Sequence, residues 1–476
     1  MRNAIIKDKA DKERQRFIDF IDTDAICRLA SSYHAGLPCK TFGSPKHGSF
    51  NVCVFVEFDT SPPEKWAVRI PLPARAAWID EKIETELATM SRAMDRYVTA
   101  KTTIPVPRVH AYSFTEGSPI QTAFIIMDYI QGQTLKDLGF KKGKQWRSYT
   151  RPTEATSKLH EQLADVYIQL RQLEFPKIGA LGLPVVDGKP SYACDPNDIR
   201  VCHRPMSIEI TMQELEGMDP GARIKPRTTF STARSFVDAL FWLAENEFDK
   251  SPDIGLDTRG GRNTLYARHH FRRFVLDTWL DSAADKGPFV LMHGDMNMLM
   301  SNLLFDEELT LVGVLDWEWS YVIPAQMLVP PVWLTGGSLE WMLLNKSSFY
   351  TEVGRLIATI RNREQALQVL PQLSREWAKM ETWCHTAVVI ALLSPDLTHD
   401  VYWHFLFDEI EEAMPPDSDF REFYLTAIAP RLTAFMEPPE RKALLTRKEE
   451  EQRRFFEDEK EHFNNPYARH IIEEGC

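Results

Sequence analysis

Two short apolar runs, each followed at once by an acidic segment, constrain the fold of this chain more than any other feature. Phe289–Met292 leads into His293–Asp295, and Leu311–Leu315 leads into Asp316. Runs of four or five apolar residues that stop at polar residues are typical of short buried strands. The pattern therefore predicts two core strands that bring two carboxylates to the edge of one cleft.

The polar residue types in this region are those that phosphoryl transfer requires. One carboxylate must orient the attacking hydroxyl and accept its proton, and oxygen ligands must hold Mg²⁺ against the phosphates of a nucleotide. Asp295, Asn302 and Asp316 supply a carboxylate, a carboxamide and a second carboxylate in that order. We predict that Asp295 is the catalytic base. The alternative is a turn aspartate that caps a helix.

Further motifs precede these strands in a characteristic order: Gly48–Asn51, Trp66–Pro71, Glu86–Met90, Ile104–Pro107 and Phe124–Met127. Together with the two acidic segments, they resemble the aminoglycoside phosphotransferase and choline kinase-like family, in particular its large fungal branch. The resemblance runs from about residue 40 to about residue 335, with a poorly matching insert. It implies a protein-kinase-like α+β fold, with a small antiparallel-sheet N-lobe, a larger mainly helical C-lobe, and ATP and Mg²⁺ between them.

The resemblance assigns the magnesium ion to Asp316 and Asn302. Asp316 ends a strand and precedes a bulky aromatic residue, as the metal aspartate of the family does. The family's asparagine follows the catalytic aspartate by five residues, where this chain has Met300. Asn302 lies seven positions on and precedes the family's apolar continuation, which favours a catalytic loop two residues longer. Asn297 is the alternative ligand, and the methionine-rich loop leaves open a protein that binds nucleotide without transferring phosphate.

Arg69 stands where most kinases place the lysine that contacts the α- and β-phosphates. Its planar guanidinium can bind a phosphate and a carboxylate together. The resemblance implies that Glu86, on the following helix, is its partner, and Glu84 is the second choice. The alternative for the pair is a surface ion bridge that contributes little energy.

Four more residues are predicted to hold the nucleotide. Gly48 and Ser49 would form a turn whose backbone amides approach the phosphates, although a plain hairpin loop explains them nearly as well. Met127 and Tyr129 would offer backbone groups to adenine. The predicted apolar walls of the adenine site are Val52, Ala67 and Ile125.

Two neighbours of the acidic segments have other expected roles. We expect His293 to orient the catalytic loop through hydrogen bonds, and not to act as an acid or a base. The resemblance implies that Glu318 and Trp319 lie at the floor of the substrate side.

The chain divides into four predicted regions: a helical N-terminal extension (1–38), the N-lobe (39–128), the C-lobe (129–445) with an insertion at about 180–262, and a charged tail (446–476). Strands are expected at 51–58, 66–70, 108–114 and 122–127. Helices are expected at 9–30, 79–97, 157–173, 231–246 and 267–282 because apolar residues recur there at helical spacing.

Composition excludes several classes of protein. The net charge of −12 argues against nucleic-acid binding, which requires clustered Lys and Arg. The seven cysteines are scattered without a C-x-x-C pair, which favours a reducing compartment and no zinc site. No apolar run is long enough to cross a membrane. Because the basic N-terminus also carries acids, a mitochondrial presequence is weakly supported, and we expect a cytosolic location.

These features predict an ATP- and Mg²⁺-dependent kinase that acts on a hydroxyl of a small molecule. No Ala-Pro-Glu segment follows Asp316, and the chain runs almost directly into Pro324, which disfavours a protein kinase. The second hypothesis is a catalytically inactive, kinase-like scaffold that binds nucleotide. The sequence does not identify the acceptor, because one fold hosts many substrates.

Overall fold

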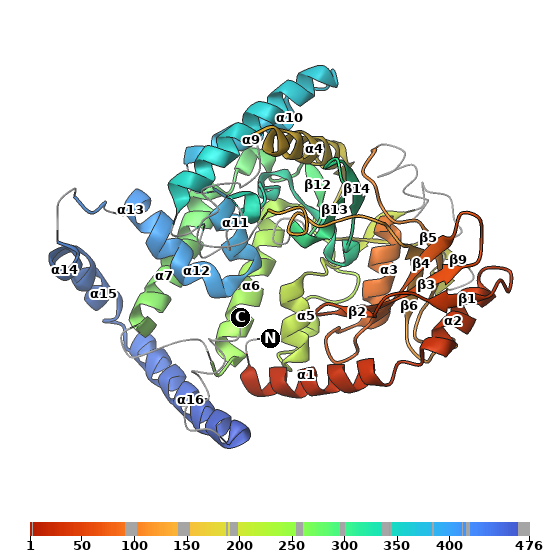
Figure 1. Ribbon diagram of the computed structural model, residues 1–476. Helices are drawn as coiled ribbons and strands as arrows, with labels where there is room; N and C mark the ends of the chain where they lie inside the picture. Colours follow the sequence, from red (N-terminus) through yellow and green to blue (C-terminus); the bar gives the residue numbers. More distant parts are fainter. Residues whose placement is uncertain are drawn as a thin grey trace.

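The computed structural model describes residues 1, 3–90, 102–140, 153–186, 189–190, 199–253, 260–295, 300–335, 342, 345–382, 385–411, 413–415 and 419–464. The chain forms a small lobe built on a sheet and a larger lobe built mainly of helices (Figure 1). The predicted two-lobe α+β architecture is therefore confirmed.

The N-lobe is an antiparallel sheet with the strand order β1-β3-β4-β6-β5, and β2 pairs with β3 beside β1. β-Branched and aromatic residues dominate its two long strands, in keeping with their β-propensity. All four predicted strands are present. The strands are β1 (Cys39–Thr41), β2 (Lys46–His47), β3 (Asn51–Phe58), β4 (Glu64–Pro71), β5 (Val109–Ser113) and β6 (Phe124–Asp128).

The two faces of this sheet pack against different helices, because side chains alternate between the faces along each strand. Val54, Val68 and Ile126 share a hydrophobic cluster with α2 (Thr23–Ser32). Ala67 and Ile125 share the main core cluster with α3 (Ile79–Met90) on the opposite face. The second face is the one that meets the C-lobe.

The single helix predicted at 9–30 is wrong, since two helices cover this segment, α1 (Ala4–Asp19) and α2. The helix is interrupted between them because the Asp22 carboxylate accepts hydrogen bonds from the amides of Asp24 (2.9 Å) and Ala25 (3.0 Å) and so caps a new helix. The helix predicted at 79–97 begins as expected in α3, and residues 91–97 lie outside the described chain.

The C-lobe contains two small antiparallel sheets that carry the acidic segments. One has the order β15-β12-β7, and the other is the hairpin β13-β14. Their strands are β7 (Glu174–Phe175), β12 (Phe289–Met292), β13 (Leu303–Phe305), β14 (Leu311–Val314) and β15 (Tyr321–Pro324). The two predicted core strands are thus present, in neighbouring sheets.

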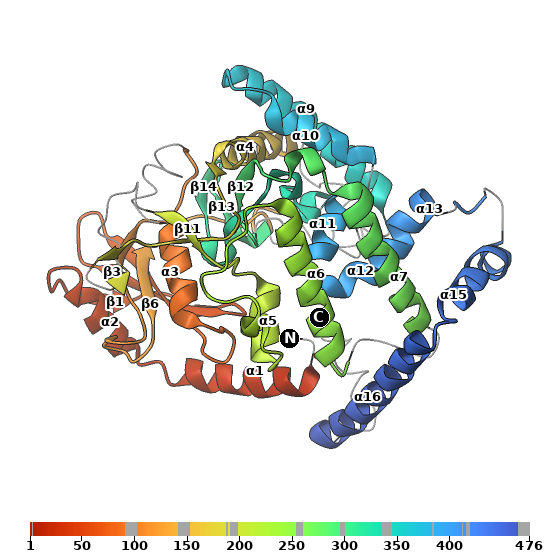
Figure 2. The same ribbon diagram turned by 180° about the vertical axis from the view of Figure 1, so that it is seen from behind.

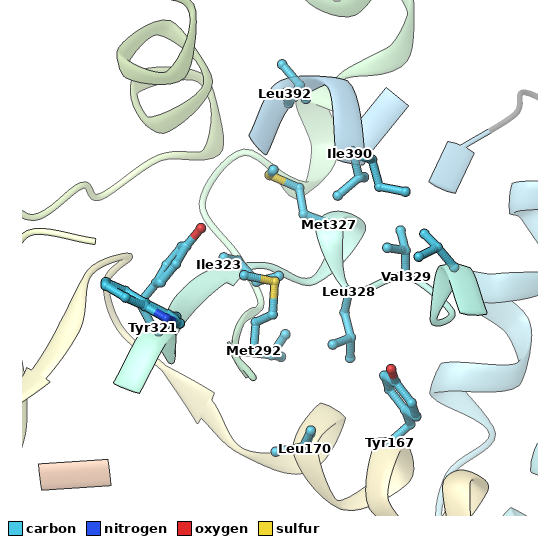
Figure 3. Packing of buried hydrophobic residues seen from close by; sticks show 14 of the residues in the cluster. Tyr167, Leu170, Met292, Tyr321, Ile323, Met327, Leu328, Val329, Ile390 and Leu392 are labelled. Carbon is cyan, nitrogen blue, oxygen red and sulfur yellow. The ribbon is translucent and has the colours of Figure 1, made fainter. Parts of the chain in front are cut away.

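Helices enclose these sheets, with α4 and α9 side by side on one flank (Figures 1 and 2). Figure 3 shows the packed interior, where side chains of α4, β12, β15 and α11 meet. The helices outside the insertion are α4 (Thr153–Gln172), α7 (Gly260–Phe274), α9 (Lys346–Ala366), α10 (Gln372–Ala378), α11 (His385–Leu393), α12 (Thr398–Val401), α13 (Phe407–Ile410), α14 (Phe420–Phe423), α15 (Ala429–Phe435) and α16 (Pro439–Phe463).

The helix predicted at 157–173 is confirmed as α4. The one predicted at 267–282 begins earlier, as α7, and continues as a π-helical turn, Val275–Trp279. Among the described residues, no helix combines the length and the apolar character that crossing a membrane requires.

The poorly matching segment contributes strands and helices between the lobes. It holds β8 (Ala180–Gly182), β9 (Val185–Val186), β10 (Lys189–Pro190), β11 (Arg200–His203), α5 (Ile208–Leu215) and α6 (Ala233–Lys250). The helix predicted at 231–246 is α6, which the Thr232 side chain caps; α5 was not predicted. Gly179 bridges to Val322 of β15, so the segment is joined to the core sheet.

Candidate active site

The ends of the two predicted core strands meet in space. His293 follows β12, and its imidazole Nε2 donates a hydrogen bond to the carbonyl oxygen of Leu315 at 2.7 Å. Leu315 directly precedes Asp316, so this bond ties the segment of Asp295 to that of Asp316. The geometry supports the orienting role expected for His293. Burial lowers the pKa of His293 to about 4, which keeps the ring neutral at pH 7.

Asp295 is buried, with 6% of its surface exposed. Burial, together with the neighbouring charges of Glu318 and Asp316, raises the pKa of its carboxyl to about 8, against the effects of Arg69 and Lys82. A carboxylic acid in this environment keeps its proton at pH 7 unless more positive charge arrives. The site is therefore arranged so that a bound cation would release Asp295 as a base.

Asp316 lies in the left-handed region of backbone conformation, with φ +62°. A non-glycine residue pays roughly 1 kcal/mol or more for that conformation, which aspartate tolerates better than most residues. The short 3₁₀ helix Trp317–Trp319 follows it immediately. The turn leaves the Asp316 side chain 39% exposed, while Oδ1 lies 2.8 Å from Nη1 of Arg69.

Arg69 of β4 is the cation at the centre of the site, and it is buried. Its Nη1 lies 2.9 Å from Glu86 Oε1 on α3, and its Nη2 lies 2.9 Å from Glu318 Oε2. The structure thus brings together the predicted pair of Arg69 and Glu86. Glu84 faces away and pairs with Nε2 of His203 at 3.0 Å, so the second choice is excluded.

Sequence reasoning missed a second buried cation. Nζ of Lys82 on α3 forms an ion pair with Glu318 and donates a hydrogen bond to Oδ1 of Asn51 at 3.0 Å. Asn51 Nδ2 in turn donates to Glu318 Oε2 at 2.7 Å. The signal was present, because Lys82 precedes Glu86 by four residues and therefore shares its helix face.

The expected position of Glu318 at the floor of the substrate side is wrong. Its carboxylate is held by the N-lobe residues Asn51, Arg69 and Lys82, and it joins the two lobes. These contacts lower the pKa of Glu318 to about 2, with Lys82 as the largest favourable contribution against the effect of burial. The chain position of Glu318 gave no indication of this, since its partners lie more than 200 residues away.

Counting charges tests whether a metal ion fits here. Two cations, Arg69 and Lys82, face four carboxylates, Glu86, Asp295, Asp316 and Glu318. With all four carboxylates ionised the excess is two negative charges, which one divalent cation would balance. Without a cation, the raised pKa of Asp295 keeps that carboxyl protonated at pH 7 and relieves part of the excess. Consistently, burial raises the pKa of Glu86 to about 7 although Arg69 opposes it. In the described part of the chain, no three His, Cys, Asp or Glu side chains form a closed metal site.

Asn302, the predicted second metal ligand, is joined through its backbone to the segment of Asp316. It is 4% exposed and its backbone carbonyl accepts a hydrogen bond from the amide of Leu315 at 2.8 Å. Its side-chain Nδ2 is buried and has no hydrogen-bond partner among the described residues. Rotation of the terminal amide would present Oδ1 to a cation, so the residue fits Mg²⁺. Asn297, the alternative ligand, lies outside the described residues.

The predicted nucleotide turn is a tight hairpin. The amide of Gly48 donates to the carbonyl oxygen of Asn51 at 3.0 Å, and Gly48 and Ser49 are exposed. Open space surrounds the position of a Cβ at Gly48, so sterics do not demand a glycine there. The following residue, Phe50, packs edge-on against Trp319 with ring centroids 4.9 Å apart.

The predicted adenine walls are partly wrong. Ala67 of β4 and Ile125 of β6 lie on the sheet face toward the C-lobe, as expected, and Met127 of β6 shares that face. Val52 packs on the opposite face with α2. In the strand register Cys53 lies opposite Arg69 and Phe55 opposite Ala67. Because directly paired residues share a face, Cys53 and Phe55 replace Val52 beside the site.

Tyr129 follows β6 at the connection between the lobes. Its backbone amide donates to the carbonyl oxygen of Lys65 at 3.1 Å, which leaves its own carbonyl as the group available to a base. Its ring packs edge-on against Phe42 and Phe55, with ring centroids 5.0 and 5.1 Å away.

Comparison with known proteins connects this arrangement to one family. The family model of the phosphotransferase enzyme family matches residues 54–327, more than half of the chain. The match contains both strand ends, Arg69 and Glu86.

Two curated proteins are similar to parts of the chain. Altered inheritance of mitochondria protein 9 of Meyerozyma guilliermondii is 25% identical over 161 residues, 34% of this chain and 22% of that protein. Clavilactone A biosynthesis cluster protein Y of Ampulloclitocybe clavipes is 25% identical over 295 residues, 61% of this chain and 63% of that protein. The matches thus span less than two thirds of either relative.

Among solved structures, a thermostable mutant of aminoglycoside phosphotransferase APH(4)-Ia in ternary complex with AMP-PNP and hygromycin B is similar. It shares 13% identity, with a TM-score of 0.40, over 79% of this chain and 95% of that chain.

Proposed function

The chain belongs to the phosphotransferase enzyme family, and on that premise we propose that it transfers the γ-phosphoryl group of ATP, in the presence of Mg²⁺, to a hydroxyl of a small molecule. The observation that carries the proposal is the junction of the two acidic segments, made by the His293–Leu315 hydrogen bond and by the ion pair of Arg69 with Asp316. Magnesium would neutralise charge on the transferring phosphates.

Asp295 orients the acceptor hydroxyl and takes its proton as the new oxygen–phosphorus bond forms and the bond to the β-phosphate oxygen breaks. Its pKa, raised to about 8 without a cation, supports this role, because the carboxylate that a bound cation would free lies in surroundings that favour uptake of the hydroxyl proton. Asp316 and Asn302 would hold the metal ion. The exposed Asp316 carboxylate and the unpartnered Asn302 amide support that assignment.

Arg69 contacts the α- and β-phosphates while Glu86 holds its guanidinium in place. Gly48 and Ser49 would cover the phosphates, and Met127 and Tyr129 would line and bind adenine. The complex of a solved relative with AMP-PNP supports the choice of nucleotide. The division into lobes at residue 128, the insertion and a cytosolic location remain part of the proposal.

ADP release and nucleotide binding test the proposal together. The purified chain is incubated with ATP, Mg²⁺ and a panel of alcohols, and ADP is measured for the wild type, Asp295→Asn and Asp316→Asn. The matched control is Asp238→Asn, a helix residue whose largely solvated side chain pairs, among the described residues, with Arg234 four residues before it. We expect alcohol-dependent ADP release that both site variants lose by at least about 100-fold and the control keeps.

Loss of turnover alone does not identify the cause, so binding is measured by thermal shift with ATP and Mg²⁺. Mg²⁺-dependent ATP binding without turnover of any alcohol would instead support the scaffold hypothesis. Retention of full activity in Asp295→Asn would refute the assignment of the base.

A further inference from the structure

A cavity lies directly beside the proposed catalytic loop. Its volume is about 80 Å³, and its walls include Gly294, the residue before Asp295, and Trp319. Met292 and Tyr321 reach it from the ends of β12 and β15, and Ile390 reaches it from α11. Figure 3 shows Met292, Tyr321 and Ile390 converging from these separate elements on one region of the interior.

The loop and the cavity wall are in close contact. A Cβ on Gly294 would clash with the carbonyl oxygen of Trp319 and lie 2.8 Å from its Cβ. Only glycine allows the catalytic segment to approach the Trp319 backbone this closely. The Trp319 ring also lies 5.5 Å from Nζ of Lys82 and packs against Phe50 of the N-lobe. Trp319 therefore separates the charged phosphate side from the cavity.

The cavity lining is uncharged and mainly apolar. None of the described residues that line it carries a carboxylate, an ammonium, a guanidinium or an imidazole. Of its hydroxyls, that of Ser207 already accepts a hydrogen bond from the amide of Ile210 at 3.3 Å. A cationic ligand placed here would lose its hydration without gaining a counter-charge, which is strongly unfavourable.

One polar group in the wall is unused. Trp319 is 1% exposed, and its indole Nε1 has no hydrogen-bond partner among the described residues. A buried donor without an acceptor is costly, and most buried donors in proteins are paired. A ligand in the cavity that brings one acceptor oxygen within reach of Nε1 would satisfy it.

We propose that this cavity binds the body of the acceptor, and that the substrate is a neutral, hydrophobic alcohol with one further hydrogen-bond-accepting oxygen. The inference rests on the proposed phosphotransferase function and adds its substrate class. It excludes amino sugars and quaternary amines as the preferred acceptors. Ile208, which is 36% exposed at the start of α5, lines the mouth of the cavity and belongs to the insertion, so the insertion contributes to specificity.

The test measures binding and transfer separately, with named probes. Isothermal titration of the full chain uses 1-butanol, 1-pentanol, 1-hexanol and 4-methoxybenzyl alcohol, with choline and kanamycin as charged comparisons. The same compounds are then offered as acceptors with ATP and Mg²⁺. We expect affinity to rise about fourfold for each added methylene until the cavity is full. Choline and kanamycin should bind at least about tenfold more weakly than 1-hexanol.

Two variants locate the binding. Ile208→Asp puts a charge at the mouth of the cavity. The residue is exposed at the start of a helix, where an acid is compatible with folding, so the variant should weaken binding of 1-hexanol by on the order of tenfold. Ile208→Leu is its apolar control and should change little. Trp319→Phe removes the donor and should reduce the preference for 4-methoxybenzyl alcohol over 1-hexanol.

The outcomes separate the two proposals. The neutral alcohols could bind, and bind more weakly to Ile208→Asp, without any phosphoryl transfer. That result would uphold the ligand class and overturn the kinase function. Preferential transfer to choline or kanamycin would uphold the kinase and overturn the substrate class. If no alcohol binds, or if Ile208→Asp and Ile208→Leu bind 1-hexanol equally, the cavity assignment is wrong.

Discussion

Replacing Asp295 by asparagine should remove activity and at the same time stabilise the fold. The carboxyl is buried, and its pKa is about 8 in the folded chain against an ordinary value of 3.8. Between those two values the folded chain holds a proton that the unfolded chain has lost. Stability must therefore fall as pH rises through this window. Asparagine has nearly the same shape and carries no charge, so it escapes this penalty.

The size of the effect follows from the shift. Each pH unit inside the window costs up to about 1.4 kcal/mol, so the penalty at pH 7 is at most about 4 kcal/mol. Any relaxation of the site or entry of water reduces it, and a poorly paired asparagine amide costs about 1–3 kcal/mol. We expect a net gain of about 1–3 kcal/mol at pH 7, which becomes smaller toward pH 5.

Urea unfolding of the metal-free protein at pH 5, 6, 7 and 8 measures this gain. Asp238→Asn is the matched control, and its exposed ion pair should contribute less than about 1 kcal/mol at every pH. Adding Mg²⁺ and ATP should stabilise the wild type more than Asp295→Asn, because the added cation lowers the cost of the charge. A variant less stable than the wild type at pH 8, or a gain independent of pH, would show that the folded chain does not hold this proton.

Three further predictions follow from the same contacts. Lys82→Met should destabilise the fold by about 3 kcal/mol because it leaves Glu318 buried with one cation fewer. In urea unfolding, the double variant with Glu318→Gln should be less destabilised than the sum of the two single variants. Additive losses of stability would contradict the pairing. Hydrogen bonds with Cys202 and Glu84 outweigh burial and raise the pKa of His203 to about 10. The stabilisation that protonated His203 gains from Glu84 is therefore fully present below pH 6.5 and is lost as pH rises through 10. Glu84→Gln should flatten the unfolding profile across that range, and an unchanged slope would show that the pair is not coupled. Cys53→Tyr should weaken ATP binding, measured by titration calorimetry, at least about tenfold through steric overlap. The same change at Cys39, a residue of the edge strand β1, should leave ATP binding unchanged.

Local patterns were sufficient for most elements. The strands at 51–58 and 66–70 are rich in β-branched and aromatic residues, and their partners are near in sequence. Arg69 and Glu86 were paired correctly because one lies on a strand and the other on the next helix, in an order that the family motifs specify. The helix at 9–30 was misjudged, since apolar spacing continues across the Asp22 cap.

The errors at the site concern which face a residue occupies. Val52 and Cys53 are adjacent, and period-2 alternation puts them on opposite faces of the sheet without saying which face meets the C-lobe. That choice is made by packing, since α2 covers the face of Val52. Glu318 was misplaced for a related reason, because its partner Asn51 lies 267 residues away.

Local residue types and order along the chain are enough to locate the acid-bearing strands, the basic residue on β4 and its helical partner. Packing of the lobes is needed to see that Lys82 and Glu318 join them, that Asp295 is buried enough to hold a proton near pH 8, and that Trp319 closes an uncharged cavity beside it. Burial and pairing between distant segments shift pKa values and select ligands, and both arise only when the lobes pack together.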